Sequence, residues 1–210
     1  MPRLLLSGFE PFGGSTVNPS ASVVEAIGIE GVPGADVQVV CLPVVGGVGA
    51  GSAFARLASV VESFMPDTIV SFGEAADATH LRFERVAINV RDDRIPDNAG
   101  VQLVDQLIVV DGAVAHFASL PLRTMRDACE GEGVPAMLSN SAGTFLCNEL
   151  MYRTLDAMAT RRWPTVTRAG FVHVPQLPEQ VARRGGVSMR LDHQLLGLRA
   201  SLLTLSAPLG

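Results

Sequence analysis

The sequence lacks the features that mark secreted, membrane-spanning and nucleic-acid-binding proteins. The apolar run Leu4-Leu5-Leu6 is too short for a signal-peptide core, and no apolar stretch is long enough to span a bilayer. No run of basic residues is present, and the formal net charge is −5 at pH 7. The sequence therefore favours neither nucleic acid nor a membrane as a partner, and we expect a cytoplasmic protein.

Cysteine is scarce, and its spacing does not suit a metal site. The three cysteines, Cys41, Cys129 and Cys147, are far apart, with no Cys-x-x-Cys and no close cluster of histidine and cysteine. This number and spacing argue against a disulfide framework and against a structural zinc site. We therefore expect free thiols in a reducing compartment, with no metal and no other cofactor.

A glycine loop for nucleotides is also missing. The run 46–51 contains four glycines, but Ser52 and Phe54 occupy the positions where Gly-x-Gly-x-x-Gly requires its third glycine. No Gly-Lys-Ser/Thr sequence is present either. We predict a flexible turn here, and a nucleotide-handling α/β protein is the weakest of three functional hypotheses.

What the sequence does contain is an alternation of predicted strands and helices. Short apolar, valine-rich runs predict strands, and apolar residues at helical spacing predict helices. This order indicates a single α/β domain over residues 1–210, a three-layer α/β/α sandwich with a mixed, largely parallel central sheet. We predict strands at 3–7, 36–45, 68–72, 83–90, 135–139 and 169–174, helices at 18–27, 53–65, 122–130, 147–161 and 191–205, and a hairpin or surface excursion at 101–112.

Cys147 lies near the start of a predicted helix. There, free N–H groups and the helix dipole favour a thiolate, although an isolated cysteine is more often a small buried hydrophobe. If strand 135–139, helix 147–161 and strand 169–174 form a right-handed crossover, both strands run parallel, and Cys147 and His173 lie at one sheet edge. Such a pair would suit a nucleophile and its general base.

A cysteine–histidine pair needs a third group that orients the imidazole. The acidic candidates are Glu84, at the start of an apolar strand, and Asp92, Asp93 and Asp97, in a charged turn. Aspartates in such a turn usually form a solvated face. Physical reasoning alone favours Glu84 only slightly.

Several long stretches then decide between these options, because they occur in the same order in one known family. They are Gly8-Phe9-Glu10-Pro11-Phe12-Gly13-Gly14 with Asn18-Pro19, Leu42-Pro43-Val44-Val45, Glu84-Arg85-Val86-Ala87-Ile88-Asn89, Arg94-Ile95-Pro96-Asp97-Asn98, the run from Ser139 to Asn148, and Phe171-Val172-His173-Val174-Pro175. Through them the chain resembles pyroglutamyl peptidase I, the pyrrolidone-carboxylate cysteine peptidases, up to about residue 180.

The resemblance implies a cysteine exopeptidase that hydrolyses the bond after an N-terminal pyroglutamyl residue through a thioester. Cys147 would be the nucleophile, His173 the general acid and base, and Glu84 the group that orients His173. Asn18 would bind the lactam N–H, the backbone at Glu74 the lactam carbonyl, and Arg94 would add positive charge. The pocket walls would be Phe9, Phe12, Val44, Ile95, Phe145 and Leu146. The resemblance also implies a homo-oligomer, a dimer or tetramer, with 101–112 as a candidate contact.

One stretch departs from the family pattern. After Gly73 the family has an uncharged residue and an Ala-Gly-Gly-Arg-like loop, whereas this chain has the stretch from Glu74 to His80, with two acids and no arginine. Gln176 stands where the family often has an aromatic residue. These departures leave a second hypothesis open, a catalytically weak or inactive pyroglutamyl-peptide-binding protein of the same fold.

Overall fold

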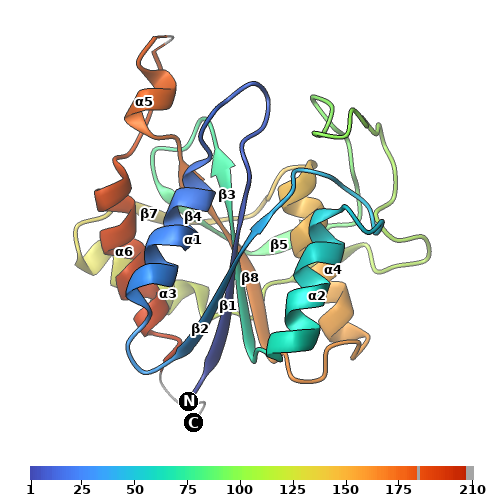
Figure 1. Ribbon diagram of the computed structural model, residues 1–210, viewed down its shortest axis with the longest axis horizontal. Coiled ribbons are helices and arrows are strands. Elements are labelled where there is room, and N and C mark those ends of the chain that lie inside the picture. Colours follow the sequence, from blue (N-terminus) through green and yellow to red (C-terminus); the bar gives the residue numbers. More distant parts are fainter. Residues whose placement is uncertain (184, 207–210) are drawn as a thin grey trace.

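The computed structural model of the chain describes residues 1–183 and 185–206, and helices and strands alternate along most of this length (Figure 1). In chain order the elements are β1 (Arg3–Phe9), α1 (Pro19–Glu30), β2 (Asp36–Leu42), α2 (Ala53–Phe64), β3 (Thr68–Ala75), β4 (Leu81–Glu84), β5 (Val86–Ile88), β6 (Ala115–Phe117), α3 (Leu122–Gly131), β7 (Ala136–Ser139), α4 (Leu146–Ala159), β8 (Arg168–Pro175), α5 (Pro178–Val181) and α6 (Leu191–Leu203). Across these described ranges, no helix has the length and apolar character needed to cross a membrane.

Within the described residues, six strands form one sheet in the order β2-β1-β3-β8-β4-β7. Strands β1, β2, β3 and β8 run parallel, whereas β4 is antiparallel to β8 and parallel to β7. The remaining pair, β5 and β6, forms a separate antiparallel ribbon. The prediction of a mixed, largely parallel sheet is confirmed.

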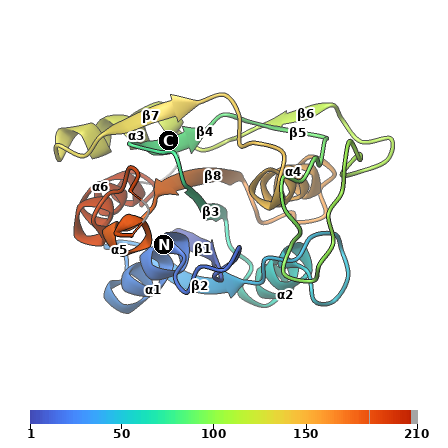
Figure 2. The same ribbon diagram turned by 90° about the horizontal axis from the view of Figure 1, so that it is seen from above.

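Helices cover both faces of this sheet, as the view from above shows (Figure 2). One core cluster contains residues of α2 and α4, and a second contains residues of α1, α3 and α6. Side chains of a strand point alternately to opposite faces, so Leu4 and Leu6 of β1 join the second cluster while Leu5 joins the first. This two-sided burial explains why the strands read as continuous apolar runs, and it confirms the predicted three-layer sandwich.

The single strand predicted at 83–90 is wrong. The chain forms two short strands there, because β4 pairs with β7 and β8 in the main sheet while β5 pairs with β6 outside it. The predicted excursion at 101–112 is a loop, held to Arg91 by two backbone hydrogen bonds with Gln106.

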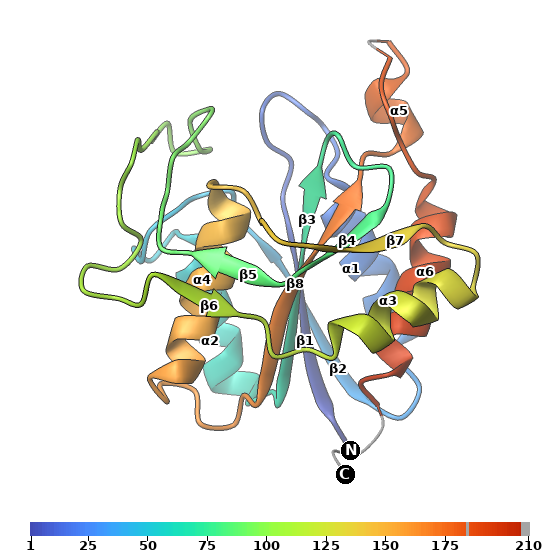
Figure 3. The same cartoon turned by 180° about the vertical axis from the view of Figure 1, so that it is seen from behind.

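The predicted crossover between strands 135–139 and 169–174 is also wrong. The antiparallel β4 lies between β7 and β8, so β7 and β8 run in opposite directions and are not neighbours. The connection after β7 instead runs across the molecule to the N-terminal end of α4, as Figure 3 shows. This connection, rather than a simple crossover, carries the start of α4 to the carboxyl ends of β3 and β8.

Candidate active site

Cys147 is the second residue of α4, which begins at Leu146 with Phe145 as its N-cap. In the described part of the chain, no side chain caps this helix start. The first-turn N–H groups, which a helix cannot satisfy internally, therefore remain available for an anion. The helix start is fixed by the buried Asn148, whose side chain donates to the carbonyls of Ile88 and Val90 and accepts from the N–H of Ile88, each at 2.9 Å.

Gly73, near the end of β3, allows the thiol to lie against the sheet. A Cβ atom at this position would lie 2.8 Å from Cys147 Sγ and 2.7 Å from the Phe171 ring, which is too close for either contact. Gly73 is the register partner of His173 on β8. The Cys147 sulfur and His173 therefore both lie next to Gly73, at the same point of the sheet.

His173 is buried, and its Nδ1 lies 2.8 Å from Glu84 Oε1. The Phe171 ring packs beside it, with the ring centroids 5.0 Å apart. Burial alone would lower the pKa of His173, but its interactions with Cys147 and with Glu84 raise it to about 10. A protonated imidazole beside a thiol favours the thiolate, which is the nucleophilic form.

Glu84 is the last residue of β4 and is fully buried. The antiparallel pairing of β4 with β8 sets Glu84 opposite Phe171 and so brings its carboxylate to His173. Its second oxygen, Oε2, has no hydrogen-bond partner among the described residues. Of the four acidic candidates, Glu84 is the one that bonds to the imidazole.

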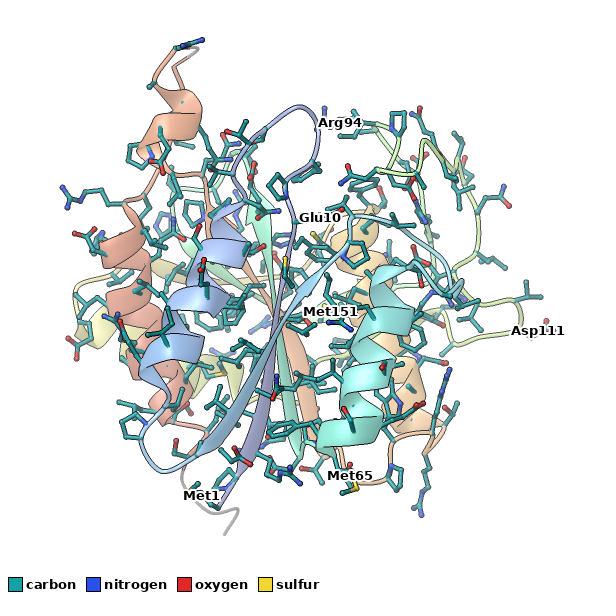
Figure 4. All side chains as sticks on the ribbon, viewed as in Figure 1. Met1, Glu10, Met65, Arg94, Asp111 and Met151 are labelled. Atoms are coloured by element: carbon teal, nitrogen blue, oxygen red, sulfur yellow. The ribbon has the colours of Figure 1, made fainter. Side chains whose placement is uncertain are left out.

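A cavity of about 190 Å³ opens beside Cys147 and His173. Its walls come from the carboxyl ends of β1 and β3 and from the loops that follow β1, β2, β5 and β7, and Arg94 and Glu10 lie at this end of the molecule (Figure 4). All the residues predicted for the substrate site line it, both the apolar walls and the polar groups: Phe9, Phe12, Asn18, Val44, Glu74, Arg94, Ile95, Phe145 and Leu146.

The two phenylalanines of the loop after β1 divide their roles. Phe9 is buried and belongs to a core cluster while it also lines the cavity. Phe12 is half-buried, and its ring centroid lies 6.4 Å from that of Phe145. The loop therefore serves both the core and the cavity wall.

The sequence model of the pyroglutamyl peptidase family matches residues 2–207 of the chain. The chain belongs to the pyroglutamyl peptidase family. It is similar to a pyrrolidone-carboxylate peptidase of Cupriavidus taiwanensis, with 41% identity over 97% of this chain and 93% of that protein. It is also similar to pyrrolidone-carboxylate peptidase 1 of Streptococcus pneumoniae, with 42% identity over 87% of this chain and 82% of that protein.

Two solved structures have the same fold. The first is pyroglutamyl peptidase I of Bacillus amyloliquefaciens, with a TM-score of 0.91 and 36% identity over 98% of this chain and 97% of that chain. The second is pyrrolidone carboxyl peptidase of Pyrococcus furiosus, with a TM-score of 0.89 and 33% identity over 96% and 97%. The similarity to these two structures therefore covers nearly the whole of this chain.

The two departures from the family pattern contact each other. Glu74 belongs to β3 rather than to the loop predicted at 74–80, and its carboxylate accepts hydrogen bonds from the side-chain amides of Gln176 and Gln180. An aromatic side chain at 176 would have no amide to donate. The charged residue at 74 is thus accommodated by neutral donors, and the cavity wall stays assembled.

Sequence reasoning missed several residues near the site. Asp92 is exposed as predicted, but Asp93 and Asp97 are buried, so a solvated face is wrong for these two. They bind the guanidinium of Arg91, which is 2% exposed. Gly73 was also missed, because its role depends on a sulfur that is distant in sequence.

Proposed function

We propose that the chain is a cysteine exopeptidase that releases the N-terminal pyroglutamyl residue from peptides. The observation that carries this proposal is the meeting of Cys147, His173 and Glu84 beside a mostly apolar cavity of about 190 Å³. This arrangement suits acyl transfer, since a nucleophile, a base and an orienting carboxylate lie together.

The cavity suits a pyroglutamyl ring, which is small, flat and uncharged. Apolar walls with a few polar groups are typical of sites for such ligands. An ordinary N-terminus carries an ammonium group, which would be costly to bury there without a partner. We expect Phe12, Phe145 and Ile95 to contact the ring.

The polar contacts of the lactam come from Asn18 and from the backbone at Glu74. Asn18 caps α1, and its amide oxygen already accepts from the N–H and the hydroxyl of Ser20 at 3.0 and 2.8 Å. A bond from the lactam N–H would share that oxygen. The lactam carbonyl is an acceptor and needs a donor, so the backbone N–H at Glu74, rather than its carbonyl, is the group that meets it.

In the first half of the reaction, the Cys147 thiolate attacks the carbonyl carbon that joins pyroglutamate to the next residue. A bond forms between Sγ and this carbon, and the oxyanion accepts hydrogen bonds from N–H groups at the start of α4. The C–N bond then breaks, and His173 gives its proton to the leaving amine. The product is a thioester and a shortened peptide.

In the second half, His173 takes a proton from water, and the oxygen attacks the thioester carbon. The C–S bond breaks, and pyroglutamate leaves with its lactam ring closed. Glu84 keeps the imidazole oriented through Nδ1 in both halves. Arg94 adds positive charge at the cavity without touching the thiol in this scheme.

The location and the assembly of the protein belong to the same proposal. A thiol nucleophile and two further free cysteines favour the reducing cytoplasm. We expect a homo-oligomer, a dimer or tetramer, because the segment 101–117 exposes six large apolar side chains: Val101, Val104, Leu107, Val110, Val114 and Phe117. Light scattering on the purified protein measures the mass, and a strictly monomeric protein contradicts this assembly.

Release of aminomethylcoumarin from its pyroglutamyl amide tests the activity. We expect turnover that iodoacetamide abolishes, and a matched alanyl or glutamyl amide should not be cleaved. A folded protein without turnover contradicts the proposal. The alternative of an inactive binding protein predicts peptide binding that is insensitive to alkylation, and the assembled Cys147–His173–Glu84 group gives it no support.

A further inference from the structure

A buried ionic cluster lies beside the cavity but takes no part in the reaction scheme. Its centre is Arg91, and its carboxylates are Asp93, Asp97 and Glu149, all of which are buried. Arg91 is not among the residues that line the cavity. The guanidinium charge of Arg91 is thus paired within the protein and does not face the cavity.

The guanidinium of Arg91 contacts three carboxylates, of which Asp93 and Asp97 belong to its own loop and Glu149 belongs to α4. It bonds to Asp93 Oδ1 and Oδ2, each at 2.9 Å, to Glu149 Oε2 at 2.8 Å and to Asp97 Oδ2 at 3.5 Å. A planar group with five donors in a fixed fork specifies both the position and the angle of its partners. Arg91 therefore fixes these segments relative to one another.

The glycine turn after β2 closes over the same guanidinium. A Cβ atom on Gly46 would lie 1.6 Å from Arg91 Nη1, so only glycine fits there. The N–H of Gly46 donates to Asp97 Oδ2 at 3.0 Å, and that of Gly47 donates to Glu149 Oε1 at 3.0 Å. The turn predicted to be flexible is thus bonded to two members of the cluster.

Each segment held by the cluster carries a residue of the active site. Glu149 follows Cys147 by two residues on α4, Gly46 follows Val44 by two residues, and Arg91 and Asp97 flank Ile95. Asn98 extends the connection, since its N–H donates to the Val44 carbonyl at 2.8 Å and its amide donates to Glu10 Oε1 at 2.8 Å. The chain of bonds thus runs from the nucleophile's helix to the loop that carries Phe9 and Phe12.

We propose that Arg91 is a positioning residue that sets the distance between the walls of the pyroglutamyl pocket and the Cys147 thiol without touching the substrate. This inference rests on the proposed function. The imidazole is held separately, by Glu84, which is not a member of the cluster. Loosening the cluster therefore weakens the capture of the lactam ring and leaves the reactivity of the thiol in place.

The test compares Arg91→Lys with Arg199→Lys, in which the same change is made at an exposed ion pair with Glu30. Four quantities are measured: KM and kcat for the pyroglutamyl coumarin amide, the rate of iodoacetamide modification on the peptide that contains Cys147, and the protection of that thiol by 2-pyrrolidone. Thermal unfolding shows that each variant is folded.

For Arg91→Lys we expect KM and the 2-pyrrolidone concentration for half protection to rise about tenfold, while kcat falls less than about threefold. The unprotected alkylation rate should stay within about twofold of the wild-type rate, and Arg199→Lys should change none of these values. Unchanged KM and protection in folded Arg91→Lys would overturn the inference. So would an alkylation rate that falls in step with kcat, because the cluster would then support the thiol itself.

A second variant covers the case in which Arg91→Lys does not fold. Asp97→Asn keeps Arg91 with Asp93 and Glu149 and should show the same pattern at a smaller amplitude, whereas unchanged KM and protection contradict positioning. A wild-type protein that is protected by 2-pyrrolidone but shows no turnover contradicts only the proposed function. One that shows neither contradicts both.

Discussion

The molecule contains two buried ionic sites that differ in how completely they are paired. At the catalytic site, Glu84 bonds to His173 through one oxygen, and its other oxygen has no partner among the described residues. In the Arg91 cluster, the carboxylate of Asp97 accepts hydrogen bonds from the backbone N–H groups of Gly46, Ala99 and Val101, and it also pairs with Arg91. One site keeps unused bonding capacity, and the other is saturated.

This difference matches what each site does. His173 gains and loses a proton during the reaction, so its surroundings must tolerate both forms, and a site saturated around one form would hinder it. A saturated cluster in a low-dielectric interior holds one geometry, and losing a partner there is costly. We therefore expect changes at the first site to abolish the chemical step, and changes at the second to lower stability and to weaken substrate capture.

The largest effect should come from Cys147→Ala. Without a nucleophile, turnover of the pyroglutamyl coumarin amide should fall by about 10⁵-fold or more, as in other enzymes that form covalent intermediates. Circular dichroism and thermal unfolding should match the wild type, because the lost thiol is only half-buried. Residual turnover near the wild-type rate would show that Cys147 is not the nucleophile.

Glu84→Gln should be the next largest. The amide keeps the size of the side chain but not its charge, so kcat should fall by about 10²–10⁴-fold. The pKa of His173, which Glu84 helps to raise, should fall toward its ordinary value of 6.5. Nitrogen chemical shifts of the imidazole against pH measure this, and an unchanged titration with normal kcat would remove Glu84 from the mechanism.

Arg91→Met tests the saturated site. Removal of the guanidinium leaves the buried carboxylates of Asp93 and Asp97 uncompensated, while Glu149 keeps Arg153, so the free energy of unfolding should fall by about 3–5 kcal/mol. Urea denaturation measures it, with Glu30→Gln at the exposed pair as the control, for which a change below about 1 kcal/mol is expected. Equal effects of the two changes would mean that the cluster does not differ from a surface ion pair.

Gly73→Ala probes the contact between the sheet and the sulfur. The new methyl would collide with Cys147 Sγ and the Phe171 ring, and overpacking of this kind costs about 1–3 kcal/mol. Because the displaced atom is the nucleophile, kcat should also fall. The control is Gly131→Ala, where nothing lies within 4 Å of the added Cβ, and a variant with full kcat at position 73 would contradict the close contact.

The smallest effect is the acid dependence of Asp97. Burial would raise the pKa of this carboxyl, but backbone N–H groups of Gly46, Val101 and Ala99 and the charge of Arg91 lower it below 3.8. A lowered pKa gives stability that is present above the unfolded value and lost as pH falls through the folded one. Asp97→Asn should therefore make the loss of unfolding free energy below pH 4 shallower, and an equally steep loss would contradict the assignment.

Local rules predicted most helices and strands of this chain. The N-cap of α1 is Asn18, as its Asn-Pro-Ser sequence indicates, and Pro66 follows the end of α2. These signals act over a few residues, so they survive in any tertiary arrangement. The direction of β4 and β7 could not be predicted in this way, because pairing partners are chosen by contacts between distant segments.

The candidate site shows the same division. Physical reasoning gave a thiol at a helix start and a histidine at a strand end, and the family resemblance supplied the pocket residues. The predicted connection between the two was wrong. The start of α4, which carries Cys147, is placed by the connection after β7 rather than by a crossover between neighbouring parallel strands. Asp93 and Asp97 were misjudged because their burial depends on α4, which brings Glu149, and on the turn at Gly46, and both approach this loop only in the folded chain.

By itself, the sequence determined the order and type of most elements, the two-sided burial of the strands, and a cysteine placed at a helix start, since each of these follows from short-range periodicity and capping. Only the tertiary structure decided that Glu84 meets His173, that Gly73 faces the sulfur and that Arg91 gathers three carboxylates beside the cavity. These contacts join residues that are far apart along the chain, and strand pairing and loop packing set their distances.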